Sequence, residues 1–119
     1  MSWNLDKNRS ICPQICERLS VRIARGDFSP NERLMSVREV ALQAGVNPNT
    51  VQKAFEQLEA QGLIYSVRGS GWFVSDGIST AKETVEKLIH DKTAAYFGSM
   101  EELGFSAEQV KQYIKEWNE

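Results

Sequence analysis

The sequence predicts a mainly α-helical fold with one small β-hairpin, arranged as a winged helix-turn-helix domain followed by a two-helix C-terminal region. Two short amphipathic segments lie on either side of a turn of about three residues, Gly45 to Asn47, which is the spacing of a helix-turn-helix. Two β-prone runs around a glycine-containing loop follow, and helical periodicity then returns. We therefore expect a winged domain over residues 1–77 and a helical region over residues 78–119.

Composition restricts the protein class. The 119 residues are 41% hydrophobic and 25% charged, which fits one compact domain with a modest appendage. No apolar run approaches the roughly 20 residues of a membrane helix. The first ten residues also lack the basic-then-apolar order of a secretion signal. These features predict a cytoplasmic protein without a membrane partner.

Charge is distributed unevenly along the chain. The net charge is −2, but residues 1–75 hold nine Lys/Arg against seven Asp/Glu, and residues 76–119 hold five against nine. Because nucleic-acid binding depends on a local basic face, the acidic total does not exclude it.

Few residues could carry chemistry. His90 is the only histidine, and no nucleophile is paired with a base, so we expect no enzymatic activity. Cys12 and Cys16 are four residues apart and would share a helix face, but a zinc site needs about four ligands. We expect reduced, partly buried thiols, no metal and no cofactor, with a metal or redox role as the alternative.

The first helix is predicted from about Ile11 to Arg25. Apolar residues recur every four positions along it, and Pro13 falls in the first turn, where a missing N–H does no harm. Gly26 ends the helix, and a loop containing Pro30 follows.

Two capped helices come next. Ser36 followed by Glu39 is a capping box, and Gly45 ends the helix that it starts. Asn47 is a good N-cap for the third helix, Pro48 suits its first position, and Gly62 closes it.

The third helix carries a polar outer face. Its inward positions are Val51, Ala54, Phe55 and Leu58, and the opposite side carries Asn49, Gln52, Lys53 and Glu56, with Thr50 at the flank. Asn and Gln can pair with adenine, and Lys can reach guanine or a phosphate. A merely solvated face is the alternative, but the neighbouring elements favour DNA recognition.

The hairpin is predicted from the runs Ile64–Val67 and Trp72–Ser75 around the loop Arg68–Gly71. The loop combines a cation with bare backbone that can approach a DNA groove. Arg38, at the start of the second helix, could clamp a phosphate or guanine, or form a surface salt bridge instead.

The tail is predicted to be helical. Thr80 and Glu83 form a second capping box before a helix reaching about Phe97, and Gly98 or Gly104 breaks it. Ser106 with Gln109 caps a last helix. Two short helices cannot bury all their apolar surface on each other, so we expect a homodimer, although packing onto the winged domain is the alternative. The expected dimerisation residues are Val85, Leu88, Ile89, Tyr96, Phe97, Val110, Tyr113, Ile114 and Trp117.

Three motifs together resemble the DNA-binding domain of the GntR family of bacterial regulators. They are Leu34-Met-Ser-Val-Arg-Glu-Val-Ala41, then the segment Gly45–Ile64, then Arg68-Gly-Ser-Gly-Trp-Phe-Val74. Taken with the reading of the helices, the resemblance implies contacts to double-stranded operator DNA by Ser36, Arg38, Asn47, Asn49, Thr50, Gln52, Lys53, Arg68, Gly69 and Ser70. Pro48 and Gln52 stand where the family often has arginine, so base preference does not transfer from other members.

About 44 residues follow the hairpin. A chain with so short a tail resembles the YtrA-type branch of that family. The resemblance implies a dimerising tail and repression of operons that encode ABC transporters, including the regulator's own gene. A winged helix used only for protein–protein contact is the alternative. Pairing of the cations Arg38, Lys53 and Arg68 with Glu39, Glu56 or Glu59 would favour it. A small-molecule effector is a further option, with Trp72, Tyr96 and Trp117 as either its walls or ordinary core residues.

Overall fold

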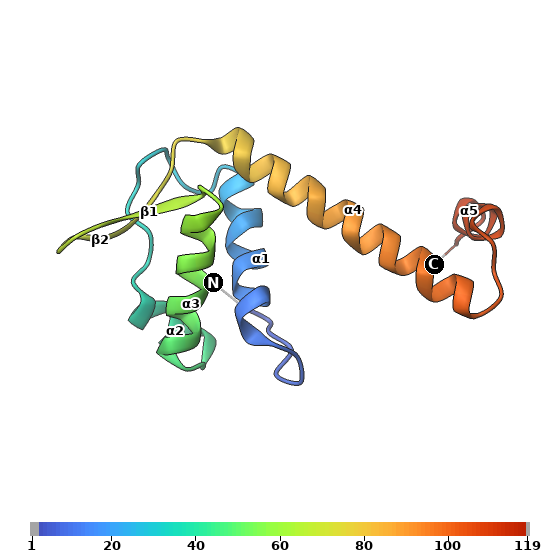
Figure 1. The fold of residues 1–119 in the computed structure, drawn as a ribbon, viewed down its shortest axis with the longest axis horizontal. Coiled ribbons are helices and arrows are strands. Elements are labelled where there is room, and N and C mark those ends of the chain that lie inside the picture. The colour runs from blue at the N-terminus through green and yellow to red at the C-terminus, as the bar shows by residue number, and fades with distance from the viewer. Residues whose placement is uncertain (1–2, 119) are drawn as a thin grey trace. The chain divides into compact units, whose positions relative to one another are not determined.

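The computed structural model describes residues 3–118 and confirms a mainly helical winged helix-turn-helix followed by C-terminal helices (Figure 1). In chain order the elements are α1 (Ile11–Ala24), α2 (Val37–Ala44), α3 (Pro48–Ala60), β1 (Ile64–Val67), β2 (Gly71–Val74), α4 (Ile78–Glu102) and α5 (Ala107–Lys115). The chain forms two compact units, Met1–Val85 and Glu86–Glu119. Within the described residues, no helix is long and apolar enough to cross a membrane.

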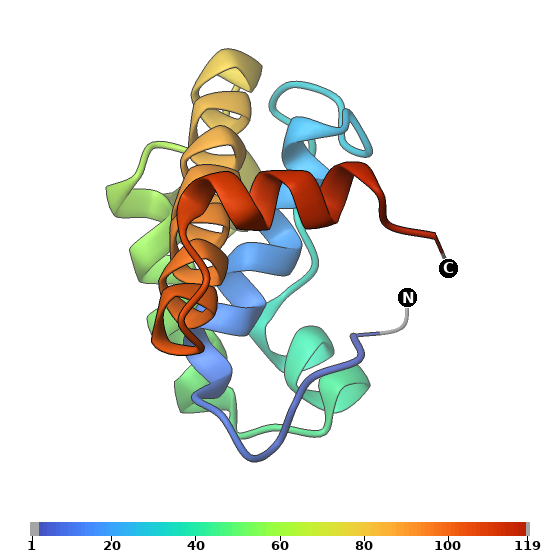
Figure 2. The ribbon, with the colours of Figure 1, turned by 90° about the vertical axis from the view of Figure 1, so that its right-hand side faces the viewer.

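Helix α3 lies at the centre of the first unit, where it packs against α1, α2 and β1. Figures 1 and 2 show α1 and α3 running side by side, with α2 at the end where α3 begins. Ile15 and Leu19 of α1 are fully buried with Val51, Phe55 and Leu58 of α3. The predicted apolar stripes therefore face one another, and the polar side of α3 is left outside.

The hairpin is a two-stranded antiparallel sheet in which Ile64 pairs with Val74 and Val67 with Gly71. Gly71, expected in the loop, is the first residue of β2, so the loop contains only Arg68 to Ser70. The rings of Trp72 and Phe55 of α3 form a T-shaped pair at a centroid distance of 5.5 Å, a favourable aromatic geometry. This contact and the buried Ile64 and Val74 attach the hairpin to the core.

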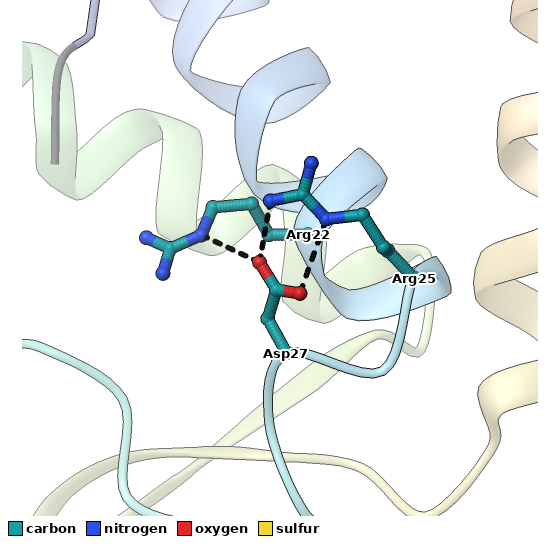
Figure 3. A network of polar contacts seen from close by, with 3 residues as sticks. All are labelled: Arg22, Arg25 and Asp27. Atoms are coloured by element: carbon teal, nitrogen blue, oxygen red, sulfur yellow. Dashed lines mark hydrogen bonds and ion pairs between the residues drawn. The ribbon is translucent and has the colours of Figure 1, made fainter.

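An ion-pair network fixes the end of α1 (Figure 3). Asp27 accepts hydrogen bonds from Arg22 Nε at 3.2 Å and from Arg25 Nε and Nη2 at 3.1 and 2.6 Å. These arginines, Arg25 above all, lower the pKa of Asp27 to about 2. The loop that leaves α1 is thus tied back to the helix, and two of the basic residues of this unit already have an acidic partner.

The start of α4 differs from the prediction. The helix begins at Ile78, so Thr80 lies inside it and forms no capping box with Glu83. The backbone N–H groups of Thr80 and Ala81 both bond to the carbonyl of Gly77, which lets the turn after the hairpin start the helix. The carbonyl of Thr80 accepts a bond from Thr84 Oγ1 at 3.0 Å, as in a helix interior.

The end of α4 also differs from the prediction, because the helix continues past Phe97 and through Gly98 to Glu102. Of the two glycines proposed as breaks, Gly104 has a φ of +89° and follows the helix end. A glycine inside a helix costs only about 1 kcal/mol relative to alanine, whereas a left-handed residue cannot continue one. The predicted Ser106–Gln109 capping box of α5 is present.

Candidate nucleic-acid interface

The capping box at the start of α2 sets the position of Arg38. Ser36 Oγ accepts a hydrogen bond from the N–H of Glu39 at 3.0 Å, and Glu39 Oε1 accepts one from the N–H of Ser36 at 3.1 Å. The bond from the Ser36 backbone is the main reason why the pKa of Glu39 is lowered. The Glu39 carboxylate is thus engaged in the cap. The neighbouring Arg38 is exposed and forms no ion pair with Glu39.

The turn between α2 and α3 is held by Gly45 and Lys7. Gly45 has a left-handed φ of +68°, which ends α2 and which a residue with a Cβ adopts only with strain. Lys7 Nζ donates to the carbonyls of Ala44 and Gly45 at 3.0 Å each. A cation at the C-terminal end of a helix stabilises its dipole, so the N-terminal segment helps to fix the angle at which α3 leaves the turn.

Helix α3 starts with the predicted cap. Asn47 Oδ1 accepts a hydrogen bond from the N–H of Asn49 at 2.8 Å, and Pro48 occupies the first helical position. The side chains of Asn49, Gln52 and Lys53 are exposed, and Thr50 is half-buried. The first half of α3 therefore presents hydrogen-bonding groups to solvent, as a recognition helix must present them to the major groove.

The hairpin tip forms the third part of the surface. Arg68, Gly69 and Ser70 are exposed, and the N–H of Ser70 bonds to the carbonyl of Val67 at 2.9 Å to close the turn. Gly69 has a φ of +80°, and a Cβ there would meet nothing within 4 Å. The tip is thus accessible from solvent. Gly69 is favoured there by the backbone conformation of the turn and not by a lack of space for a side chain.

Two groups can be distinguished among the arginines and lysines of the first unit that lie in or near the expected DNA-binding elements or have an internal partner. One group is engaged within the chain: Asp27 holds Arg22 and Arg25, and Arg18 donates to the carbonyls of Trp3 and Asn4. The other group is Arg38, Lys53 and Arg68, to which no hydrogen bond or ion pair is formed within residues 3–118.

Two of the nearby glutamates have other partners. Glu39 caps α2, and Glu59 Oε2 accepts hydrogen bonds from the N–H and Oγ of Ser66 at 3.2 and 3.1 Å. The pairing that would have favoured a pure protein–protein module is therefore not formed among the described residues. The three cations are left facing solvent with their charge available to an external anion.

Leu42 belongs to the same region, and the motif reading did not single it out. Its side chain is 78% exposed on α2, and it lines a hollow of about 370 Å³ with Arg38, Ala41, Val46 and Pro48. The signal in the sequence is an apolar residue that falls outside the buried stripe Val37, Val40, Ala41 and Ala44. Such a residue usually faces solvent without further meaning, so the sequence alone did not mark it.

The cysteines lie where α1 meets α3. Both are free thiols and half-buried, and Cys12 Sγ and Cys16 Sγ donate to Gln57 Oε1 at 3.6 and 3.3 Å. Burial raises the pKa of Cys16 to about 12, with a smaller contribution from Cys12. Among the described residues there is no group of three or more His, Cys, Asp or Glu that could hold a metal ion.

The second unit leaves most of its apolar side chains accessible. Tyr96, Tyr113, Ile114 and Trp117 line a groove of about 470 Å³ on this unit, and Trp117 is 60% exposed. Ile89 is also exposed, and Leu88 and Phe97 are half-buried, as is Val85 at the end of the first unit.

Two of the predicted residues have a different place. Val110 is fully buried within the chain, so its side chain belongs to the internal packing and is not available to a second copy. Trp72, considered as a wall for an effector, packs on Phe55 in the first unit, and we therefore assign it to the core.

Comparison with known proteins agrees with this geometry. A family described as bacterial regulatory proteins, gntR family, matches residues 13–74. The HTH-type transcriptional repressor YtrA of Bacillus subtilis is 33% identical over 115 residues, which cover 89% of this chain and 82% of YtrA.

Two solved structures are similar to the chain. A GntR family transcriptional regulator from Listeria monocytogenes has a TM-score of 0.80 and 28% identity, covering 96% of this chain and 100% of its own. AraR(DBD) in complex with operator ORE1 has a TM-score of 0.52 and 38% identity, covering 54% of this chain and 78% of its own.

Proposed function

The chain belongs to the gntR family of bacterial regulatory proteins, in the short branch that contains YtrA, and we propose that it represses transcription as a homodimer bound to operator DNA. As a member of that family it is a DNA-binding transcriptional regulator and not an enzyme. The proposal concerns which residues read DNA, how the chain assembles and what it regulates. We assign DNA binding to residues 1–77 and dimerisation to residues 78–119; of these, residues 1, 2 and 119 lie outside the described part.

The observation that carries the proposal is the set of exposed cations, Arg38, Lys53 and Arg68, without partners inside the described chain. They come from α2, α3 and the hairpin tip, the three parts with which a winged helix-turn-helix meets DNA. Phosphate contacts supply most of the affinity of such proteins. A surface that keeps its cations unpaired is therefore suited to an anionic polymer.

We divide the contacts by chemistry. Arg38, with Ser36 at the start of α2, and Arg68 with Gly69 and Ser70 at the tip anchor the phosphate backbone or enter a groove. Asn49, Thr50, Gln52 and Lys53 of α3, together with Asn47 at its cap, read base edges in the major groove. The start of α3 also adds the positive end of the helix dipole, which favours phosphate.

The homodimer is supported by the exposed apolar groove of the second unit. A two-fold dimer would place two recognition helices about one DNA turn apart, on a palindromic operator. The dimerisation set is Val85, Leu88, Ile89, Tyr96, Phe97, Tyr113, Ile114 and Trp117.

The regulatory role is carried over from relatives. YtrA is a transcriptional repressor by its name, and the resemblance to its branch implies repression of a transporter operon together with the regulator's own gene. We propose the same for this chain, acting in the cytoplasm, where the operator lies. A small-molecule effector would be an addition to this role and not a condition of it.

A gel-shift series on operator DNA recovered by selection from random sequences tests the proposal. Arg38→Ala and Lys53→Ala should each weaken binding about tenfold, through loss of a charged contact. Gln52→Ala should instead relax sequence preference. Arg25→Ala is the matched control for Arg38→Ala, because Asp27 already holds that arginine, and Lys82→Ala is the control for Lys53→Ala. Unchanged binding in all three test variants would overturn the assignment.

A further inference from the structure

A shallow hollow lies beside the helix-turn-helix, and most of its lining is apolar. It measures about 370 Å³, and its lining residues are Arg38, Ala41, Leu42, Val46 and Pro48. Ala41 is buried in the core, whereas Leu42 is 78% exposed. The hollow thus combines one cation with a carbon-rich wall, on the unit that binds DNA.

Spacing along the helices brings these groups to one surface. Leu42 lies one turn after Arg38 in α2, and residues four apart share a helix face. Pro48 is the first residue of α3. It has no N–H to donate, so at this position the recognition helix offers carbon surface and not a hydrogen-bond donor. Both features place apolar atoms next to side chains that we assign to base and phosphate contacts.

We propose that this hollow contacts the C5-methyl group of thymine in the major groove, with Leu42 and Pro48 as specificity-determining residues. This inference rests on the proposed DNA-reading surface. Thymine is the base whose major-groove edge carries a methyl group, and apolar side chains recognise it by contact. An operator that fits this protein would therefore carry a thymine near the base or phosphate that Arg38 contacts.

Charge decides between DNA and a protein as the occupant. An apolar protein segment seated in the hollow would also cover Arg38, for which the described residues supply no carboxylate. A buried cation without a partner is costly. DNA avoids that cost, because each base in the major groove is flanked by phosphates. The same duplex can thus supply the methyl group and the anion.

Thymine-to-uracil substitution in the selected operator tests the proposal. Uracil keeps the O4 acceptor and the base pair of thymine and lacks only the methyl group. With the full-length wild-type chain, replacement of one thymine in a single half-site should raise the Kd about fourfold, the value expected for one apolar carbon removed from water. If no thymine in the operator responds to the substitution, the proposal is overturned.

Variants of the protein test whether Leu42 and Pro48 contact the thymine methyl group. Leu42→Ala and Pro48→Ala should each reduce the difference between thymine and uracil at the responsive position. Leu103→Ala is the matched control, because this leucine is 75% exposed in the second unit, and the difference should persist there. A thymine effect that survives both test variants would overturn the role of the hollow. Failure to select any preferred sequence would instead overturn the proposed function itself.

Discussion

At the scale of single residues, availability distinguishes the arginines and lysines of the first unit from one another. Arg25 has the same chemistry as Arg38, but Asp27 holds its guanidinium at 2.6 Å. Glu39 and Glu59 bond to Ser36 and Ser66. Arg38, Lys53 and Arg68 are exposed and form no ion pair among the described residues. An ion pair on a surface contributes little to stability. Leaving these cations unpaired therefore costs the fold little and keeps them available for phosphate.

Cys16 provides a prediction for pH dependence. Burial raises its pKa from 9.0 to about 12, so above pH 9 the folded state retains a proton that the unfolded state loses. The free energy of unfolding should therefore fall as the pH rises from 9 toward 12. Because the thiol is partly exposed, we expect a loss of about 1 kcal/mol between pH 8 and 10.5.

Chemical denaturation of the wild-type chain and of Cys16→Ser at both pH values measures this effect. The serine variant lacks the thiol and should lose less stability over that interval, and every other titratable group is common to the two proteins. An equal loss in the two proteins would show that the burial of Cys16 does not affect its titration.

At the scale of elements, the caps decide where the helices begin and end. Ser36 with Glu39 and Ser106 with Gln109 form complete capping boxes, and Asn47 caps α3. These were predictable because a cap depends on residues within one turn. The start of α4 was not predictable in this way. Its first helical hydrogen bonds run to the carbonyl of Gly77, which lies in the connection after the hairpin and precedes Thr80.

The glycines give a paired prediction of opposite sign. Gly45→Ala should lower the free energy of unfolding by about 1 to 2 kcal/mol, because a Cβ is strained at a φ of +68°. Gly98→Ala should raise it by about 0.5 to 1 kcal/mol, because Gly98 lies in a helix and a Cβ there meets nothing within 4 Å.

Thermal melting followed by circular dichroism checks both variants. Gly45→Asn serves as an intermediate case, since asparagine tolerates the left-handed conformation better than alanine does. A stabilising Gly45→Ala would contradict the geometry of the turn, and a destabilising Gly98→Ala would place a helix break where the structure has none.

At the scale of the whole molecule, the two units have different surfaces. The first unit buries an apolar core and exposes cations, whereas the second exposes the aromatic groove of Tyr96, Tyr113, Ile114 and Trp117. The second unit also holds seven Asp/Glu against four Lys, and an acidic segment is disfavoured near phosphate. These properties support the proposed division into a DNA-reading unit and an assembly unit.

Dimerisation through the groove gives the prediction at this scale. The double variant Ile114→Ala/Trp117→Ala should weaken the dimer at least about a hundredfold, because aromatic residues in an interface core carry much of its binding energy. Sedimentation velocity at micromolar concentration measures the change. Lys111→Ala, on α5 like Ile114 and exposed, is the control and should remain dimeric. A wild-type chain that sediments as a monomer would contradict the homodimer.

The sequence by itself determined the fold class, the caps of α2, α3 and α5, the buried stripes and the family, because each depends on residues close together in the chain. Only the tertiary structure decided which charges are engaged, since Asp27, Glu59 and Lys7 find their partners through loops and neighbouring elements. The structure likewise buried Val110 and left Leu42 at the surface. Both outcomes depend on which elements pack together, and helical periodicity along a single segment does not contain that information.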